Sequence, residues 1–203
     1  MAGTPDETDV LDEVRVDAAG CTRCPLHEIG TQTVFGAGPA TAALMFVGEA
    51  PGAQEDQSGE PFVGPAGKLF DEALTEVGID RSRVYVTNAV KHRPSVQSES
   101  GRRKNRAPKQ SEITACAIWL DRETEIVQPS LICCLGAVAA KRVLGKSFKL
   151  MAQRGQWFTS DGGYAVLATV HPSFVMIQRP DARERWMETF VDDLREVQRR
   201  LDE

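Results

Sequence analysis

The feature that most constrains this chain is a set of four short apolar runs separated by longer, more polar stretches. The runs are LMFVG (44–48), VYVTNA (84–89), LICCLG (131–136) and YAVLATV (164–170). Each run is too short for a core helix and continuous enough for a strand that is buried on both faces. We therefore predict four strands of a parallel sheet.

Helical patterns fill the stretches between and after these runs. They cover residues 64–78, 111–127, 137–145 and 182–201. The first ends at Gly78, a natural C-cap, and the second begins at Ser111 as its predicted N-cap. Strands that alternate with helices predict right-handed βαβ units with helices on both faces of the sheet. The predicted fold class is α/β, a three-layer α/β/α sandwich around a four-stranded parallel sheet.

The length and composition fit one soluble domain. A chain of 203 residues can form a single domain over 1–203, in which we expect residues 1–15 to be a flexible acidic terminus. The longest apolar runs are far shorter than the roughly 20 residues that span a bilayer, and no signal-peptide pattern is present. We expect a cytoplasmic monomer that has no contact with membranes.

Charge is unevenly distributed along the chain. The formal net charge is −5, which argues against a protein that coats nucleic acid. Residues 1–20 are acidic, whereas residues 91–109 carry seven cationic side chains against one glutamate. The stretch GRRKNRAP (101–108) can be a solvated loop or a site for an anion, and its position after the second run favours contact with phosphates.

Unusual polar residues follow three of the predicted strands. Glu49 lies in the tight turn GEAPG, Asn88 closes the second run, and His171 begins HPS after the fourth. Each alone has an ordinary structural explanation, and Phe62 in PFVGPAG can be a packed loop residue or an aromatic wall for a planar ligand. Because parallel strands end at one edge of a sheet, the three polar residues together predict a site there. The turn at Glu49 has neither GxGxxG nor the P-loop lysine, which excludes both of these phosphate-binding motifs.

Cysteines indicate a metal centre. Cys21 and Cys24 form a CxxC pair, and His92 and Cys116 are the further candidate ligands. The pair precedes the first strand, which argues against a thioredoxin-like dithiol, whereas zinc and an iron–sulfur cluster both fit these ligands. The cysteines at 133–134 lie inside a predicted strand and are interpreted as core residues.

The ordered set of motifs resembles the uracil-DNA glycosylase superfamily, in particular its iron–sulfur family-4 enzymes and the related UdgX-type proteins that trap DNA covalently. The shared motifs include CTRCPL, LMFVGEAPG, EDQSGEPFVGPAGKL, VYVTNAVKHRP, NRAP, CAIWL, LGAVAAKRVLG and TVHPS. The resemblance implies the uracil-DNA glycosylase fold and an enzyme that flips uracil out of DNA and hydrolyses the N-glycosidic bond. It also implies uracil-containing DNA as the partner and a four-iron, four-sulfur ([4Fe-4S]) cluster as the cofactor.

The resemblance also implies roles for individual residues. Glu49 and His171 stand at the catalytic positions. Around the uracil stand Gly48, Ala50, Asp56, Phe62, Asn88 and Asn105. Contacts with DNA are implied for Arg102, Arg103, Arg106, Ser173, Val175 and Met176, of which Val175 and Met176 are candidates to fill the gap left by the base. The implied cluster ligands are Cys21, Cys24, His92 and Cys116.

Two features of the resemblance indicate different subtypes. The long basic segment before NRAP and the histidine of KHRP resemble the UdgX type. In contrast, Ala50 in GEAPG resembles family 4, and Asn105 stands where the trapping proteins have a histidine that bonds to the sugar. Because an amide is a very poor nucleophile, we predict release of uracil and turnover. The alternatives are a uracil-DNA binding or trapping protein with little turnover, and a metal-stabilised nucleotide-binding protein unrelated to repair.

Overall fold

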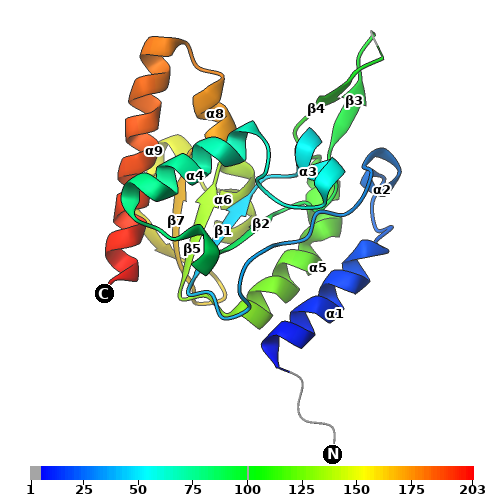
Figure 1. The fold of residues 1–203 in the computed structure, drawn as a ribbon, viewed down its shortest axis with the longest axis horizontal. Helices are drawn as coiled ribbons and strands as arrows, with labels where there is room; N and C mark the ends of the chain where they lie inside the picture. Colours follow the sequence, from blue (N-terminus) through cyan, green and yellow to red (C-terminus); the bar gives the residue numbers. More distant parts are fainter. Residues whose placement is uncertain (1–5, 100) are drawn as a thin grey trace, which may run out of the picture.

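Five strands form one mixed sheet in the order β2-β1-β5-β7-β6 in the computed structural model, which describes residues 6–99 and 101–203 (Figure 1). The strands are β1 (Leu44–Gly48), β2 (Tyr85–Asn88), β5 (Leu131–Leu135), β6 (Trp157–Thr159) and β7 (Ala165–Thr169). The first, second, third and fifth of these are parallel and fall in the four predicted runs. β6 pairs antiparallel with β7, so the predicted four-stranded parallel sheet is corrected to a mixed sheet of five strands. A three-residue, half-exposed edge strand has no apolar run by which a sequence would reveal it.

The predicted helices are present with small changes at their ends. They are α4 (Pro65–Val77), α5 (Gln110–Val127), α6 (Ala137–Leu144) and α9 (Pro180–Leu201). α5 is capped by Lys109 and not by Ser111, because the Glu112 side chain accepts a hydrogen bond from the Lys109 amide at 2.6 Å. Shorter helices are α2 (Leu26–Ile29), α3 (Ala53–Ser58), α7 (Leu150–Gln153) and α8 (Pro172–Met176), with a 3₁₀ turn at Arg81–Arg83.

The N-terminal region differs from its prediction. Residues 1–5 of the expected flexible terminus lie outside the described residues, but helix α1 (Glu7–Ala19) begins directly after Asp6, whose carboxylate accepts from the amide of Asp9. Leu11 and Val14 are buried against the core, and α1 packs on α5. The many acidic residues of this segment occupy the exposed side of a helix that an apolar stripe holds in place.

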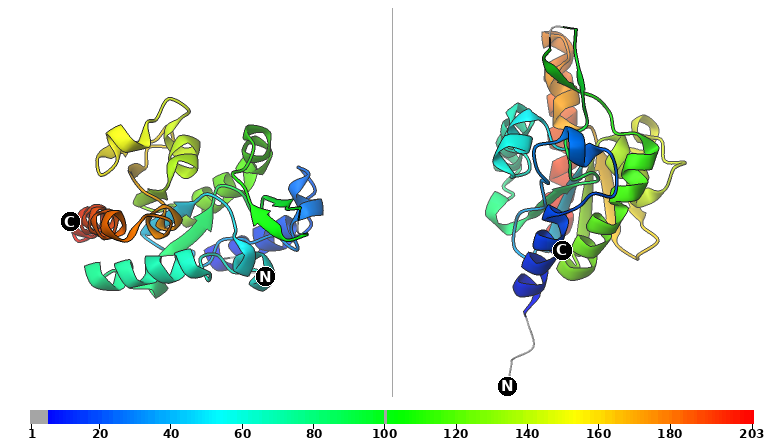
Figure 2. Two further views of the ribbon diagram at one scale, coloured as in Figure 1. Left: turned by 90° about the horizontal axis from the view of Figure 1, so that it is seen from above. Right: turned by 90° about the vertical axis from the view of Figure 1, so that its right-hand side faces the viewer.

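The sheet is buried on both faces. Met45 and Val47 of β1 belong to a core cluster with residues of α1, α5 and α6, whereas Leu44 and Phe46 belong to a second cluster with residues of α4 and α9. Successive strand residues point to opposite faces, so these clusters lie on opposite sides of the sheet. The view from above in Figure 2 shows α4 on one side and α6 on the other.

A basic hairpin projects beyond the sheet. It consists of β3 (Ser95–Gln97) and β4 (Arg103–Asn105), which pair antiparallel. The side view in Figure 2 shows it extending toward the same end of the molecule as α8 and the start of α9. The hairpin contains most of the cationic stretch that the sequence singles out, so this charge lies beside the end of the sheet. Among the described residues, no helix is long and apolar enough to cross a membrane.

Candidate active site

A cavity of about 960 Å³ lies at the carboxyl ends of the parallel strands. Its lining includes Glu49 after β1, Asn88 at the end of β2, Gly136 after β5 and His171 after β7. The three polar strand-end residues predicted from the sequence therefore surround one cavity, as the topology of a parallel sheet requires.

Phe62 forms part of the cavity wall in a strained backbone conformation. Its φ is +59°, a region that bulky residues rarely adopt, and its ring is almost fully buried. The ring centroid lies 6.0 Å from that of His171, and the two planes are inclined by 34°. A Cβ at Gly67 would lie 1.8 Å from the carbonyl oxygen of Phe62, so glycine is required where α4 passes this loop. Phe62 therefore lines the cavity while its ring also packs on Phe70, with centroids 5.3 Å apart.

The turn after β1 holds Glu49 half-buried in the cavity wall. A Cβ at Gly48 would lie 2.4 Å from Asn88 Oδ1 and 2.6 Å from Phe62 Cζ, so only glycine allows these side chains to approach the backbone. The carbonyl of Glu49 accepts from the amide of Val90, which joins this turn to the segment after β2. Burial raises the pKa of the Glu49 carboxyl above its usual value.

His171 caps helix α8, and this role determines its tautomer. The Ser173 amide donates to His171 Nδ1 at 3.1 Å, and Ser173 Oγ lies 2.7 Å from the same atom. Enclosure by the protein lowers the pKa of His171 to about 4, so the ring is neutral at pH 7. Because Nδ1 accepts, the proton of the neutral ring is on Nε2, which is therefore a hydrogen-bond donor.

Asn105 reaches the cavity from the basic hairpin. Arg93 Nε donates to Asn105 Oδ1 at 2.7 Å, which uses the amide oxygen. The Asn105 Nδ2 atom lies on the side toward Gly52, 3.7 Å from where a Cβ at that glycine would be. Arg93 itself is buried, so the hairpin is attached to the core at this point.

The other predicted site residues divide into three groups. Ala50, Ser173 and Met176 line the cavity, and Arg102 and Arg103 are exposed on the hairpin. Asp56, Arg106 and Val175 differ from their predicted environments, as described next.

The three departures have clear physical causes. Asp56 is buried behind the wall, where its carboxylate accepts from the amide and hydroxyl of Thr31 at 2.7 and 2.9 Å. Arg106 lines the cavity, but its Nη1 and Nη2 atoms donate to the Glu112 carboxylate at 2.8 and 2.6 Å. The guanidinium is therefore already paired within the protein. Val175 is 0% exposed in the core under α8 and cannot reach a ligand outside the protein.

The structure also contains site residues that the sequence reasoning missed. Glu55 is buried in the wall and accepts from the Gly64 amide at 2.7 Å, which holds the loop of Phe62. Ile177 and Met151 line the cavity and are 79% and 58% exposed, although both are large and apolar. Ile177 directly follows the predicted Met176. No sequence pattern shows which side chain of FVMI is exposed at the cavity and which is buried in the core.

The three candidate cysteine ligands lie in one region beside α5, and the fourth candidate, His92, directly follows Lys91, which contacts Cys116. Trp119 Nε1 donates to Cys21 Sγ and the Lys91 amide donates to Cys116 Sγ, both at 3.2 Å. Burial raises the pKa of Cys116 to about 11, and the charges of Cys24 and Cys21 act in the same direction, so these three thiols are neighbours. No three Cys, His, Asp or Glu side chains among the described residues are arranged to hold a single metal ion. The three thiols are soft sulfur donors, which both zinc and iron–sulfur clusters accept.

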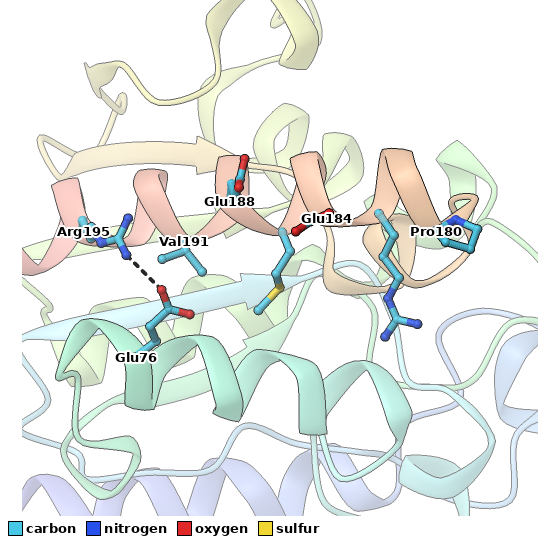
Figure 3. A pocket seen from close by; sticks show the side chains of 8 residues that line it. Glu76, Pro180, Glu184, Glu188, Val191 and Arg195 are labelled. Carbon is cyan, nitrogen blue, oxygen red and sulfur yellow. Dashed lines mark hydrogen bonds and ion pairs between the residues drawn. The ribbon is translucent and has the colours of Figure 1, made fainter.

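A second hollow, of about 500 Å³, lies between α4 and α9 (Figure 3). Arg195 Nη2 pairs with Glu76 Oε1 across it at 2.9 Å, and both side chains are more than half exposed. Its other charged residues, among them Glu184 and Glu188, also belong to the outer surface of α9. This hollow lacks the convergent buried polar groups of the first cavity.

Comparisons with known proteins find related chains. The model of the uracil DNA glycosylase superfamily matches residues 35–195. The type-4 uracil-DNA glycosylase of Sulfurisphaera tokodaii is 36% identical over 190 residues, which cover 90% of this chain and 82% of the relative. That of Thermotoga maritima is 40% identical over 178 residues, which cover 87% and 88%. The crystal structure of wild-type Pedobacter heparinus SMUG2 is similar in fold, with a TM-score of 0.57 and 14% identity over 78% of this chain and 77% of that one.

Proposed function

The chain belongs to the uracil-DNA glycosylase superfamily, and on that premise we propose that it excises uracil from DNA by hydrolysing the N-glycosidic bond. The observation that carries the proposal is the convergence of Glu49, Phe62, Asn88 and His171 on one cavity at the strand ends. A carboxylate, an aromatic face, an amide and a neutral imidazole are the groups that this reaction needs.

Recognition of the base is assigned to Phe62 and Asn88. A uracil inside a duplex is stacked and must be extruded into a pocket, at a cost of a few kcal/mol. The Phe62 ring offers a stacking face, and the planar amide of Asn88 can pair with the O4 acceptor and N3 donor of uracil. Cytosine presents the reversed pattern at these positions and would leave the amide mismatched.

Bond cleavage is assigned to His171 and Glu49. As the glycosidic bond breaks, negative charge develops on the uracil and positive charge on the sugar. His171 Nε2–H is oriented as a donor and would stabilise the uracil anion at O2, without needing a protonated ring. The Glu49 carboxylate would stabilise the sugar cation and orient the attacking water.

Contacts with the DNA strand are assigned to the basic hairpin and to the residue that follows α8. Arg102 and Arg103 are exposed on the hairpin and would contact phosphates, whereas Arg106 holds the hairpin to α5 through Glu112. Ile177 replaces Val175 as the side chain proposed to fill the space left by the base, because it is exposed at the cavity and Val175 is not.

We further propose a [4Fe-4S] cluster held by Cys21, Cys24, His92 and Cys116. The neighbouring thiols and the two N–H donors to their sulfurs support this assignment. When bound, the cluster would serve as a structural link between the segment after α1, the segment after β2 and helix α5. The hydrolysis itself transfers no electrons. A brown protein with broad absorbance near 400 nm would support the cluster, and a colourless zinc protein would reject it.

Turnover is proposed in preference to covalent capture. Asn105 lines the cavity from the hairpin, and its amide is a very poor nucleophile. The specific alternative is a UdgX-type protein that remains bonded to the abasic site, which the long basic hairpin favours.

One experiment tests both versions. A uracil-containing oligonucleotide is incubated with the protein and divided between an alkali-cleavage assay and a denaturing gel. We expect alkali-labile sites to exceed the amount of protein, with no shifted band that survives heat and detergent. Glu49→Gln and His171→Ala should lose most of the excision activity but keep binding. A stable adduct would reject turnover, and an uncut strand would reject the glycosylase activity.

A further inference from the structure

A buried ion pair lies directly beneath Asn88 on the α5 side of the sheet. Lys91 and Glu123 are both 0% exposed, and Lys91 Nζ lies 2.5 Å from Glu123 Oε2. Thr87, the residue before Asn88, donates from Oγ1 to the same carboxylate at 2.8 Å. We call Thr87, Lys91 and Glu123 the β2 triad. None of the three lines the cavity.

The lysine ammonium is fully used inside the protein. Its three hydrogens are donated to Glu123 Oε2 and Thr87 Oγ1, each at 2.5 Å, and to the backbone carbonyl of Asn88 at 2.9 Å. An ammonium has three donors, so none remains for a substrate or for water. Any effect of Lys91 on a ligand in the cavity must therefore pass through the residues that it holds.

Glu123 connects the triad to helix α5 and to the loop before β1. Its Oε1 accepts from the Gly36 amide at 2.9 Å and from the Tyr85 hydroxyl at 3.2 Å. Four groups thus converge on one carboxylate, which fixes the end of β2 relative to α5. Buried charges are costly unless fully paired, so such a network holds one arrangement closely.

The segment that the triad holds carries the uracil-facing amide. After Asn88 the chain turns, and the amides of Ala89 and Val90 donate to the carbonyls of Gly48 and Glu49 at 2.9 and 3.1 Å. A shift of the Asn88 backbone would therefore move its side chain and loosen the turn of Glu49. We propose that the β2 triad is a positioning device that sets Asn88 for recognition of uracil; this inference rests on the proposed function.

The test removes the charges without leaving one of them unpaired. Lys91→Met/Glu123→Gln keeps acceptors for Gly36 and Tyr85 but removes the donor to the Asn88 carbonyl. Since a displacement of about 1 Å can cost on the order of 100-fold in rate, we expect kcat/KM for a uracil oligonucleotide to fall by roughly 10- to 100-fold. Inhibition by free uracil should weaken in parallel.

A double-mutant cycle separates positioning from simple loss of stability. In an Asn88→Ala background, the same pair of substitutions should change kcat/KM by less than about threefold, because residues that act through one group are not additive. Leu11→Ala in α1 is the matched control, since it removes a side chain from the core cluster on the α5 side of the sheet and does not line the cavity. It should leave KM and uracil inhibition at wild-type values under native conditions.

The outcomes distinguish this inference from the proposed function. If the wild-type chain releases no uracil, the proposed function fails and the inference falls with it. If the wild type releases uracil but the paired variant matches it, or if the two losses add in full, only the inference is overturned. If the paired variant does not fold, Thr87→Val tests the same point, with a smaller fall that again disappears in the Asn88→Ala background.

Discussion

Two of the strands that end at the cavity are fixed by similar buried side chains, one set on each face of the sheet. On the α5 side the β2 triad holds the strand of Asn88. On the α9 side, Thr169 Oγ1 donates to Asp193 Oδ2 at 2.5 Å, and Arg154 donates to both oxygens of Asp193 at 2.9 and 2.7 Å. We call Thr169, Asp193 and Arg154 the β7 triad; Thr169 lies two residues before His171.

The two triads differ in their access to water. Both charged side chains of the β2 triad are 0% exposed, whereas Arg154 is 25% exposed and Asp193 is 7% exposed. Water can therefore solvate the arginine if its partner is lost, but it cannot reach the lysine. The strand that carries Asn88 is therefore held by the arrangement that tolerates the loss of a partner less well.

The largest expected effect comes from removing each carboxylate in turn. Glu123→Ala leaves Lys91 buried without a counter-charge and should lower the free energy of unfolding by about 3–5 kcal/mol. Asp193→Ala should lower it by only about 1–3 kcal/mol, because Arg154 can turn to water. Urea denaturation measures both values. Equal losses would contradict the comparison, and Asp192→Ala, an exposed neighbour paired with Arg195, is a control expected to cost less than about 1 kcal/mol.

The residues at the two strand ends should affect different steps. His171→Ala removes a donor that acts as charge develops, so kcat should fall by roughly 100- to 1,000-fold with little change in KM. Asn88→Ala removes contacts already made with the bound base and should raise KM as well. Steady-state and single-turnover kinetics on a uracil oligonucleotide separate these effects. An effect of His171→Ala on KM alone would reverse the assignment.

The dependence on pH should come from the Glu49 end of the site and not from His171. Burial raises the pKa of Glu49 above its ordinary 4.5, and the proposed mechanism uses the ionised form. As the pH falls through that raised pKa, the carboxylate is protonated and kcat/KM should drop by about tenfold per unit. His171 has a pKa of about 4, so it stays neutral over the same range and adds no limb there.

The control variant is Glu49→Gln, which has no carboxylate to protonate. Its remaining activity should therefore not fall as the pH is lowered. A profile of kcat/KM between roughly pH 5 and 8 measures it. A limb that persists in Glu49→Gln would show that another group titrates.

The sequence predicts the parts of this site that have local signals. Four strands are visible as continuous apolar runs, and the topology of a parallel sheet then brings Glu49, Asn88 and His171 to one edge. The hairpin could not be predicted in this way, because the strands Ser95–Gln97 and Arg103–Asn105 contain a single apolar residue, Val96, and are mostly exposed.

The triads are invisible for a different reason. Lys91 and Glu123 are separated by 32 residues and Arg154 and Asp193 by 39, and a charged residue in a helix pattern is normally expected at the surface. Only packing shows that these charges are paired inside the protein. The same applies to Val175, which is buried although it was predicted to contact DNA, and to Ile177, which is exposed. Which of the two is buried depends on how α8 packs on the core.

The smallest expected effect concerns an ion pair that resembles the triads in composition but not in environment. Arg195 and Glu76 join α9 to α4 across the second hollow, 2.9 Å apart, with both side chains more than half exposed (Figure 3). Exposed pairs are screened by water and salt, so Arg195→Ala should lower the free energy of unfolding by no more than about 1 kcal/mol. Excision of uracil should be unchanged, because this hollow is separate from the cavity of Glu49. A loss as large as that of Asp193→Ala, measured in the same urea series, would show that burial is not what distinguishes the pairs.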